Sequence, residues 1–418
     1  MHQGQESASA EWRQHWPLVA AAMSGVALAT VSQASTGVMM EPLEAEFGWS
    51  RTQISLGAGA VSYTTLFLSA LAGLAVDRLG ARRIGLLAAA LLCAALAAMA
   101  SMENRLWQWF GLWIVVGVAS AAMPTVWLAG VSRVFTAGRG LAVAVVLSGS
   151  GISTFLVPVI GNALVEAYGW RTGYLGLALI WAAVSLPMIA LFFRPPENAR
   201  SNAPSAAPAV VLTGMTVREG LHAPAFWKLG LGAFLSTVGG VALILNLMPV
   251  LTFTGLPRAT AAAVAGLVGL ATIAGRIFGG WLMDRLNAKY IAACSTLVAT
   301  TLPIVLLAAP GSVALATAGV VIYGLMGGAK IGAIAYLSSR HLGAKAFGTL
   351  YGAINSMLAL AVGTAPVLAN LVYDRTQSYA PVMWAAIPVM AVAALVYLSL
   401  GTYPDFDKAR DLGQTGER

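Results

Sequence analysis

The stretch GLAVDRLGARR, residues 73–83, places four charged side chains between two long apolar runs, in a chain of which only 10% of residues are charged. A related stretch, GWLMDRLNAK, begins at Gly280. The two match as G-x-x-x-D-R-L-x-A-(R/K), with an offset of 207 residues, and the same offset relates Gly117 to Gly324. The sequence therefore predicts two similar halves.

The composition excludes a water-soluble protein. The chain has 418 residues, of which 58% are hydrophobic, and its mean hydropathy is +0.78, whereas soluble domains carry about 25% charged residues. Apolar runs of about 20 residues recur along the chain, and each is long enough to cross a membrane as a helix. A transmembrane barrel would instead alternate polar and apolar residues. We therefore predict an all-α polytopic membrane protein, with the lipid bilayer as its surroundings.

Twelve spans are predicted, near residues 16–39, 53–76, 84–101, 107–131, 140–165, 172–193, 225–252, 259–283, 290–309, 312–338, 346–372 and 380–401. A segment rich in Pro, Ala and Ser divides them into six and six, and Thr216 to Glu219 within it can form a capping box. The predicted organisation is a tail (1–15), a six-helix bundle (16–194), a linker (195–224), a second bundle (225–401) and a tail (402–418). Two such halves suggest a transporter with its site between them near the membrane midplane.

The distribution of Lys and Arg predicts the orientation. Only five of the 24 lie in alternate loops that we take as outside: Arg51, Arg105, Arg171, Arg258 and Arg375. The positive-inside rule then places both termini and the linker in the cytoplasm, with the chain in the cytoplasmic (inner) membrane. The net charge of +8 fits this bias and anionic lipid headgroups, rather than a nucleic-acid partner.

The sequence predicts neither an enzyme nor a cofactor. Cys93 and Cys294 both lie in apolar segments and give no disulfide framework or metal cluster. A P-loop motif is absent from the sequence, which argues against pumping driven by ATP.

The charges of residues 73–83 lie at a predicted helix junction on the cytoplasmic side. A carboxylate at the C-terminal end of a helix, such as Asp77, is disfavoured by the helix dipole and needs a cationic neighbour or another helix N-terminus. We predict a conformational latch that forms in one state and breaks in another. Its residues are Gly73, Asp77, Arg78, Gly80, Arg82 and Arg83, with Asp284 and Arg285 in the repeat. The alternative is positive-inside anchoring alone.

This loop resembles the signature G-x-x-x-D-R-x-G-x-R-R of the major facilitator superfamily, although the second copy has Asn287 at the glycine position. The resemblance implies the major facilitator fold: twelve transmembrane helices in two pseudo-symmetric six-helix bundles that rock to give alternating access, with a monomer sufficient. Residues 42–55 and 133–151 resemble the monocarboxylate transporters and oxalate–formate antiporters. That branch implies small carboxylate substrates.

Two cations lie deep within predicted spans, and no acidic residue or histidine lies at the centre of a span. Arg276 is about 12 Å along its helix from Asp284, and Lys330 is about 15 Å from Arg340. A charge at such depth costs at least ~2.5 kcal/mol, so a substrate anion is a natural counter-ion. Arginine can hold a carboxylate through two parallel hydrogen bonds. Alternatively, Arg276 caps backbone carbonyls or snorkels, and Lys330 is neutral.

The resemblance supports Arg276, because the branch carries an arginine in helix eight. The lysine of the oxalate transporters in helix eleven has no counterpart, since Asn355 lies in that neighbourhood, and this favours one carboxylate per substrate. Further candidates to line the site are polar and aromatic residues, each of which alone is more often a helix–helix contact: Gln33, Tyr63, Trp127, Asn246, Tyr323, Tyr351 and Asn355. Gly275 and Gly279 are predicted to pack helices closely.

The predicted function is secondary active transport of a small organic anion, foremost a monocarboxylate. Coupling is open between proton symport and exchange for a counter-anion, because the spans offer no buried acid. A drug/proton antiporter is one alternative, but Gly151 and Pro158 do not fit its G-x-x-x-G-P pattern. A porter for a neutral nutrient would not need Arg276 or Lys330. A sensor built on the same fold would need a signalling domain that the sequence does not show.

Overall fold

The computed structural model describes residues 2–132, 134–135, 139–195, 214–283, 285–343 and 345–404. Within these ranges every regular element is a helix, and an isolated bridge joins Gly214 to Gly343. The helices are α1 (His2–Phe47), α2 (Arg51–Leu79), α3 (Ala81–Met99), α4 (Leu106–Ser132), α5 (Arg139–Phe192), α6 (Val217–His222), α7 (Pro224–Ile244), α8 (Leu247–Phe253), α9 (Arg258–Met283), α10 (Ala288–Val298), α11 (Thr301–Ala308), α12 (Val313–Leu342), α13 (Phe347–Thr376) and α14 (Ala380–Leu398).

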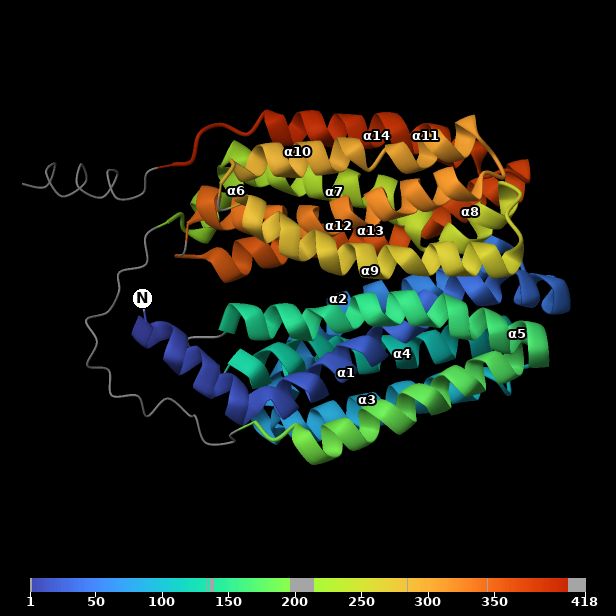
Figure 1. Ribbon diagram of the computed structural model, residues 1–418, viewed down its shortest axis with the longest axis horizontal. Coiled ribbons are helices and arrows are strands. Elements are labelled where there is room, and N and C mark those ends of the chain that lie inside the picture. The colour runs from blue at the N-terminus through green and yellow to red at the C-terminus, as the bar shows by residue number, and fades with distance from the viewer. Residues whose placement is uncertain are drawn as a thin grey trace, which may run out of the picture.

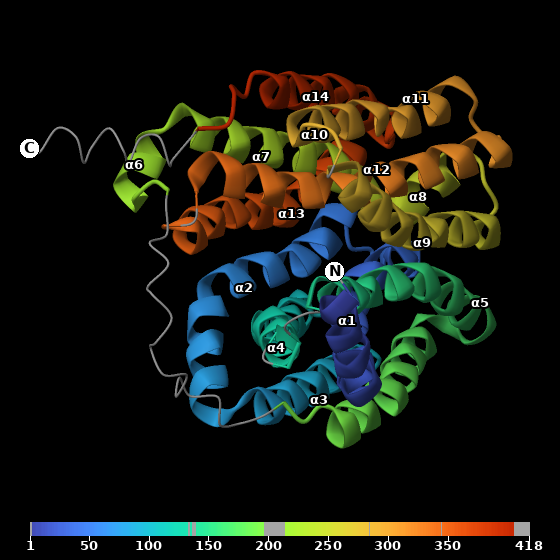
Figure 2. The same ribbon diagram turned by 60° about the vertical axis from the view of Figure 1, so that its left-hand side comes forward.

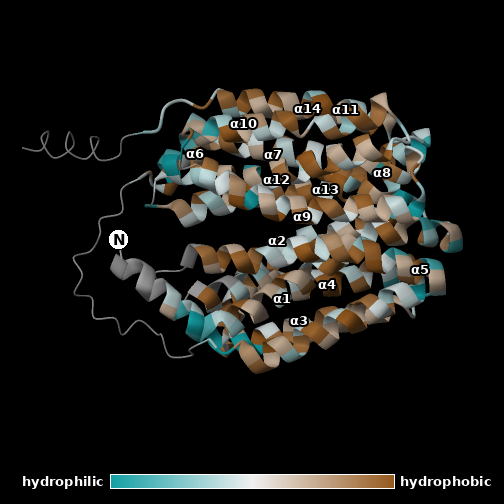
Figure 3. Cartoon of the chain, in the orientation of Figure 1, coloured by the Kyte–Doolittle hydropathy of each residue, from teal (hydrophilic) through white to brown (hydrophobic). Residues whose placement is uncertain are grey.

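The helices form two bundles that lie side by side (Figure 1). Helices α1 to α5 make one, here called the N bundle, and α7 to α14 make the other, the C bundle. Hydrophobic residues fill the middle of both bundles and polar residues gather at the two ends (Figure 3). We call these the Arg51 end and the Gly80 end, after a residue that lies at each.

Ten of the described helical segments are long and apolar enough to cross a membrane. One of them contains two crossings, because Gly169 within α5 adopts φ 83° and ψ 166°, which a glycine tolerates and an L side chain avoids. The two arms of α5 fold back on each other, so that Leu164 packs against Gly176. Helix α2, with 29 residues and more Ser, Thr and Gly, is not among the ten. Counting α2 and both arms of α5 gives the twelve crossings of the predicted fold.

Several helices differ from the predicted spans in their bounds. The span 225–252 is broken into α7 and α8, and 290–309 into α10 and α11. Pro249 and Pro303 lie just after these breaks, and a proline removes the helix hydrogen bond to the carbonyl four residues earlier. The first helix, predicted over 16–39, runs from His2 to Phe47.

The extension of α1 has an electrostatic reason. Its last turns carry Glu41, Glu44 and Glu46, which lie beyond the predicted span 16–39. Each forms a salt bridge with an arginine that follows later in the chain: Arg258, Arg51 and Arg171, respectively. Fixed partners therefore hold these acids on the helix.

The internal repeat is visible in the packing. A Cβ on Gly117 of α4 would meet Thr64 of α2, and a Cβ on Gly324 of α12 would meet Ala271 of α9. Ala271 follows Thr64 by 207 residues, the same offset that separates the two glycines. Equivalent helix pairs therefore touch at equivalent positions in the two bundles, and the predicted pseudo-symmetry is confirmed.

Two antiparallel helix pairs join the bundles: α2 with α13, and α5 with α9 (Figure 2). In the first pair, a Cβ on Gly59 would lie 2.7 Å from the carbonyl oxygen of Gly363. In the second, a Cβ on Gly269 would collide with the carbonyl oxygen of Gly151. Glycines therefore let the two backbones meet directly at both contacts.

Candidate functional site

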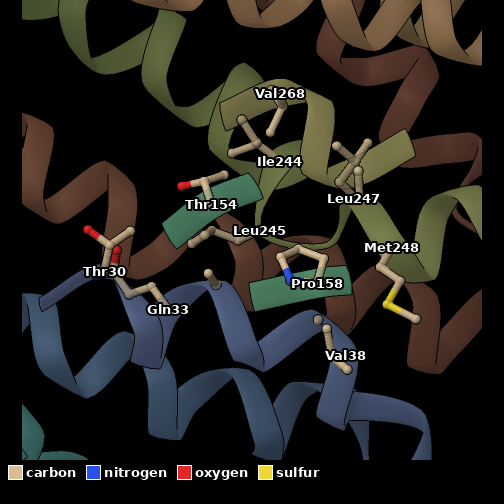
Figure 4. Close-up of a pocket in the computed structure, with 13 residues that line it drawn as sticks. Thr30, Gln33, Val38, Thr154, Pro158, Ile244, Leu245, Leu247, Met248 and Val268 are labelled. Carbon is tan, nitrogen blue, oxygen red and sulfur yellow. The ribbon is translucent and has the colours of Figure 1, made fainter. Parts of the chain in front are cut away.

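Three cavities lie where the bundles meet, and Gln33 of α1 lines all three. The largest, of about 340 Å³, is called the α4 cavity because Ser120, Pro124 and Trp127 of α4 form one wall. Another, of about 200 Å³, is called the α8 cavity. Figure 4 shows Gln33 of α1 there, with Pro158 of α5 and Leu245 nearby. The third is a narrow pocket of about 10 Å³ beside Asn246.

The residues that line these cavities are uncharged, and most are apolar. A substrate charge would therefore meet its partner at the edge of the cavities. Each cavity also contains a proline together with the residue four positions earlier: Ser120 with Pro124, Thr154 with Pro158, and Val362 with Pro366. Because proline has no N–H, the earlier carbonyl lacks its helix hydrogen bond. Each cavity is therefore lined by a residue whose backbone carbonyl lacks its helix donor.

The α4 cavity has an unusual group of unpartnered polar atoms. The hydroxyl oxygens of Thr65 and Ser120 and the indole Nε1 of Trp127 are buried and make no hydrogen bond within the described part of the chain. All three residues line this cavity, and Trp127 is fully buried. A buried polar group without a partner costs about 1–3 kcal/mol. Such a group at a cavity wall is suited to bind a polar atom of a ligand.

Arg276 of α9 reaches across the interface to the N bundle. Its Nη1 donates to the carbonyl oxygen of Leu147 at 2.6 Å and to the hydroxyl of Ser150 at 3.3 Å. Leu147 also lines the α4 cavity. Nε and Nη2, which form the edge that pairs with a carboxylate, make no hydrogen bond to any described residue. Arg276 thus makes a contact with a backbone carbonyl, which was the alternative to substrate binding. The Nε–Nη2 edge, which could bind a carboxylate, remains free.

Lys330 of α12 lies within the C bundle. Its Nζ donates to the backbone carbonyl of Ser236 in α7 at 3.0 Å. It lines none of the three cavities described above. Its contact joins two helices of one bundle, and a role in binding substrate stays a prediction.

The predicted close packing by Gly275 and Gly279 is confirmed. A Cβ on either glycine of α9 would clash with α12, at Leu325 for Gly275 and at Ala329 for Gly279. These glycines therefore allow a close helix contact and line none of the three cavities.

The other predicted site residues are divided between cavities and helix contacts. Gln33 and Trp127 line the α4 cavity, and Asn246 lines the narrow pocket. Tyr63 lies against Gly363 across the interface of the bundles, and Tyr323 packs its hydroxyl against Gly240 of α7. Tyr351 stacks on Phe347, and Asn355 is exposed on α13. A role in binding stays a prediction for each of the seven.

Charged and polar side chains close the Arg51 end. The carboxylate of Asp374 in α13 accepts hydrogen bonds from the backbone N–H groups of Arg51 and Thr52, at 3.1 and 2.9 Å. It therefore caps the N-terminus of α2, which belongs to the other bundle. Arg51 is 7% exposed, and its Nη1 donates to the hydroxyl of Tyr379 at 3.2 Å. These contacts hold the two bundles together at this end.

Arg258 makes the corresponding contact between α9 and the N bundle. It forms a salt bridge with Glu41 and donates to Asn162 at 2.8 Å and to the carbonyl of Val38 at 2.6 Å. Arg51 and Arg258 were predicted only as charges of outside loops, and their role between the bundles was not predicted. Their repeat offset of 207 was the signal that could have found it.

A buried chain of hydrogen bonds leads from the Arg51 end to the cavities. The hydroxyl of Tyr379 donates to Oδ1 of Asn370 at 2.7 Å. The amide of Asn370 donates to Ser55 and, at 2.8 Å, to Asn246. Ser55 and Asn246 both line the narrow pocket beside Gln33. The residues that close this end are thus connected to the cavity wall.

In the described part of the chain, no hydrogen bond joins the two bundles at the Gly80 end. The hydrogen bonds that do join them are found from the Arg51 end as far along the bundles as Arg276. Arg82 donates to the carbonyl of Ala190 at 2.7 Å in its own bundle, and Arg285 stacks on Trp281. Arg78 and Arg83 are exposed, and Gly73 has open space beside its Cα. The bundles are therefore closed at one end and separate toward the other.

Gly80 itself has a clear backbone role, because it joins α2 to α3 with φ 87°, in the region that favours glycine. Asp284 and the side chain of Asp77 lie outside the described residues, so the latch stays a prediction. The capping box of Thr216 and Glu219 is confirmed at the start of α6. The backbone N–H of Thr216 donates to the Glu219 carboxylate at 2.8 Å and holds its pKa below the ordinary value.

The sequence profile described as Major Facilitator Superfamily matches residues 22–366. The chain belongs to this superfamily. It is a multi-pass membrane transporter, and the predicted resemblance is confirmed. Among solved structures, a D-xylose–proton symporter is similar, with a TM-score of 0.73 and 16% sequence identity. The similarity covers 93% of this chain and 98% of that one. That likeness shows the fold alone.

Curated relatives of this transporter are distant. An uncharacterised MFS-type transporter of Escherichia coli, YhjX, is 22% identical over 56% of this chain and 58% of its own length. Monocarboxylate transporter 12 of Rattus norvegicus is 23% identical over 65% of this chain and 61% of its own length. The transporter thus spans about three fifths of the length of these relatives.

Proposed function

We propose that this transporter moves a small organic anion, foremost a monocarboxylate, by alternating access between the two bundles. The observation that carries the proposal is the free Nε–Nη2 edge of Arg276 at the bundle interface, next to the wall of an uncharged cavity. A carboxylate bound there would receive two parallel hydrogen bonds and neutralise a cation held within the membrane. The similarity to monocarboxylate transporters supports the same substrate class.

The orientation follows from the positive-inside rule. It places the protein in the cytoplasmic (inner) membrane, with the Gly80 end, the linker and both termini on the cytoplasmic side. The closed Arg51 end then faces outward, so that the structure is an inward-open state. The proposed bundles cover residues 16–194 and 225–401, with tails at 1–15 and 402–418 and the linker at 195–224. A monomer holds both bundles and suffices for the cycle.

Coupling is proposed as either proton symport or exchange of anions. In the exchange mechanism, the bundles reorient the site at Arg276 only when an anion is bound, because an unpaired cation within the membrane is costly. In symport, a proton accompanies the carboxylate. The two mechanisms differ in whether uptake needs an anion inside the vesicle.

A porter for a neutral solute is the second candidate, favoured by the uncharged linings of the three cavities. It assigns Arg276 to the structural contact with Leu147 alone. Substrates of the two candidates differ in charge, so one assay distinguishes them.

The test uses the purified protein in liposomes. Uptake of labelled acetate, lactate and benzoate is compared with that of labelled xylose, with and without an internal anion and with and without an imposed pH gradient. The proposal expects saturable uptake of a carboxylate. A requirement for an internal anion identifies exchange, and stimulation by an inward proton gradient identifies symport. Uptake of the neutral sugar without any carboxylate uptake would overturn the proposal.

A further inference from the structure

We propose that the α4 cavity binds the body of the substrate, and that this body is a ring bearing a hydroxyl group. The inference rests on the proposed function, because it takes the carboxylate to lie at Arg276. It adds a subsite formed mainly by the N bundle, with Trp127, Ser120 and Thr65 as its polar groups.

The size of the cavity excludes the smallest acids as a good fit. A volume of about 340 Å³ would hold about eleven water molecules at ~30 Å³ each, and it lies in the range of pockets that enclose ligands of drug size. A three-carbon acid would leave most of this space filled with water. A six-membered ring attached to a carboxylate would displace water from apolar wall residues such as Val61, Met123 and Val362.

The position of the cavity relative to Arg276 suits a rigid acid. Leu147 lines the cavity, and its carbonyl oxygen holds Nη1 of Arg276 at 2.6 Å. The guanidinium of Arg276 is therefore hydrogen-bonded to a residue that forms part of the cavity wall. Ser120, Pro124 and Trp127, which also line the cavity, occupy positions i, i+4 and i+7 of α4, and these positions share one helix face. A ligand held by Arg276 can thus extend toward a single face of α4.

The unpartnered polar groups on this face of α4 indicate which polar substituent the substrate ring carries. The Nε1–H of fully buried Trp127 can only donate, so it requires an acceptor. The Ser120 carbonyl lacks its helix donor because of Pro124, so it requires a donor. A hydroxyl group can serve as acceptor and donor at once. A carboxylate or an ammonium group matches only one of the two and would bring a second charge into an uncharged cavity.

The chain provides a matched control for Trp127. Trp113 lies on the same helix, is fully buried and also has an unpartnered Nε1, but it lines none of the three cavities. Replacing either tryptophan with phenylalanine removes one indole N–H and shrinks the ring. Only Trp127→Phe should change the selectivity for substrate.

The experiment measures how 4-hydroxybenzoate, benzoate and lactate compete with labelled benzoate for counterflow in liposomes. For the wild type we expect 4-hydroxybenzoate to bind about tenfold more tightly than benzoate, and both more tightly than lactate. Trp127→Phe should reduce the preference for the hydroxyl at least threefold, whereas Trp113→Phe should keep it. If Trp127→Phe does not fold, Pro124→Ala gives a second test, because it restores the N–H that bonds the Ser120 carbonyl and should reduce the same preference.

The outcomes separate this inference from the proposed function. If the carboxylates compete but lactate binds as tightly as the ring acids, or if the variants of Trp127 and Pro124 keep the hydroxyl preference, the subsite is wrong while carboxylate transport stands. If no carboxylate is carried or competes, the proposed function fails and the subsite fails with it.

Discussion

Arg51 and Arg258, which are 207 positions apart, begin α2 and α9, and each reaches from its own bundle to the other at the same end of the molecule. Arg51 donates to Tyr379, the residue before α14, at 3.2 Å, and Arg258 donates to Asn162 of α5 at 2.8 Å. The internal repeat therefore supplies two equivalent arginines, one for each bundle. Together they form a closure that has to break if the Arg51 end is to open.

The cap on α2 should control this closure. Asp374→Asn keeps a side-chain acceptor but removes the negative charge next to the helix N-terminus, where a charge is favoured. Loss of a favourable charge beside a helix N-terminus costs about 0.3–1 kcal/mol, which is a change of up to about fivefold in an equilibrium. We expect the variant to populate states open at the Arg51 end more than the parent does, by up to about fivefold. Distances between spin labels at Tyr168→Cys and Val313→Cys, measured after replacement of Cys93 and Cys294, report the change.

Glu103→Gln is the control for that experiment, because Glu103 pairs with Arg105 on the exposed surface of the N bundle alone. Its distance distribution should match that of the parent. A distribution for Asp374→Asn that also matches the parent would show that the cap does not hold the bundles together.

The pair of Arg258 and Glu41 should be strongly coupled. Their side chains are 22% and 34% exposed, compared with 56% and 64% for Arg105 and Glu103. Screening by water makes an exposed pair worth about 0–1 kcal/mol, whereas close, partly desolvated pairs reach about 1.5 kcal/mol or more in double-mutant cycles. A cycle of Arg258→Gln and Glu41→Gln, read from the same spin-label distances, should give the larger coupling. Equal coupling for the exposed pair would contradict the role of Arg258.

The glycines between the bundles should be required for closure. Gly59→Ala places a Cβ 2.7 Å from the carbonyl oxygen of Gly363, and Gly269→Ala makes a similar collision with Gly151. Overpacking of this kind costs about 1–3 kcal/mol, here only while the bundles are in contact. We expect both variants to fold but to transport at least fivefold more slowly. Gly352→Ala on α13 meets open space and is the control; transport slowed equally in that variant would refute the close contact as the cause.

The sequence was sufficient for the fold because its apolar runs and the repeat act over long, regular stretches. The repeat offset from residues 73–83 recurs in the contacts of Gly117 and Gly324. The break in α5 at Gly169 falls between the predicted spans 140–165 and 172–193. The breaks between α7 and α8 and between α10 and α11 were not resolved, since a single proline inside an apolar run leaves the average hydropathy almost unchanged. Helix α1 continued into its acidic segment because of salt bridges with residues distant in the sequence, which no local pattern contains.

The candidate site was predictable only in part. Depth within a span singled out Arg276, and its position at the bundle interface agrees with that reasoning. The partners of Tyr323 and Lys330 depend on how α7 and α12 rotate about their axes, and one sequence does not determine that rotation. Ser120 and Thr65 were missed because a lone hydroxyl in an apolar span has no pattern. Their significance comes from the missing hydrogen bonds in the folded chain.

The central claim is that the free edge of Arg276 binds the carboxylate of the substrate. Counterflow of a labelled monocarboxylate in liposomes tests it most directly, with Arg276→Gln and Arg276→Lys compared with Arg105→Gln, whose arginine pairs with Glu103 on the exposed surface of the N bundle. Loss of a bidentate charged contact costs about 2 kcal/mol or more, about thirtyfold in affinity, and lysine does not restore its geometry. We predict that both Arg276 variants lose affinity to this extent while Arg105→Gln retains it. Normal affinity for the carboxylate in folded Arg276→Gln would contradict the account.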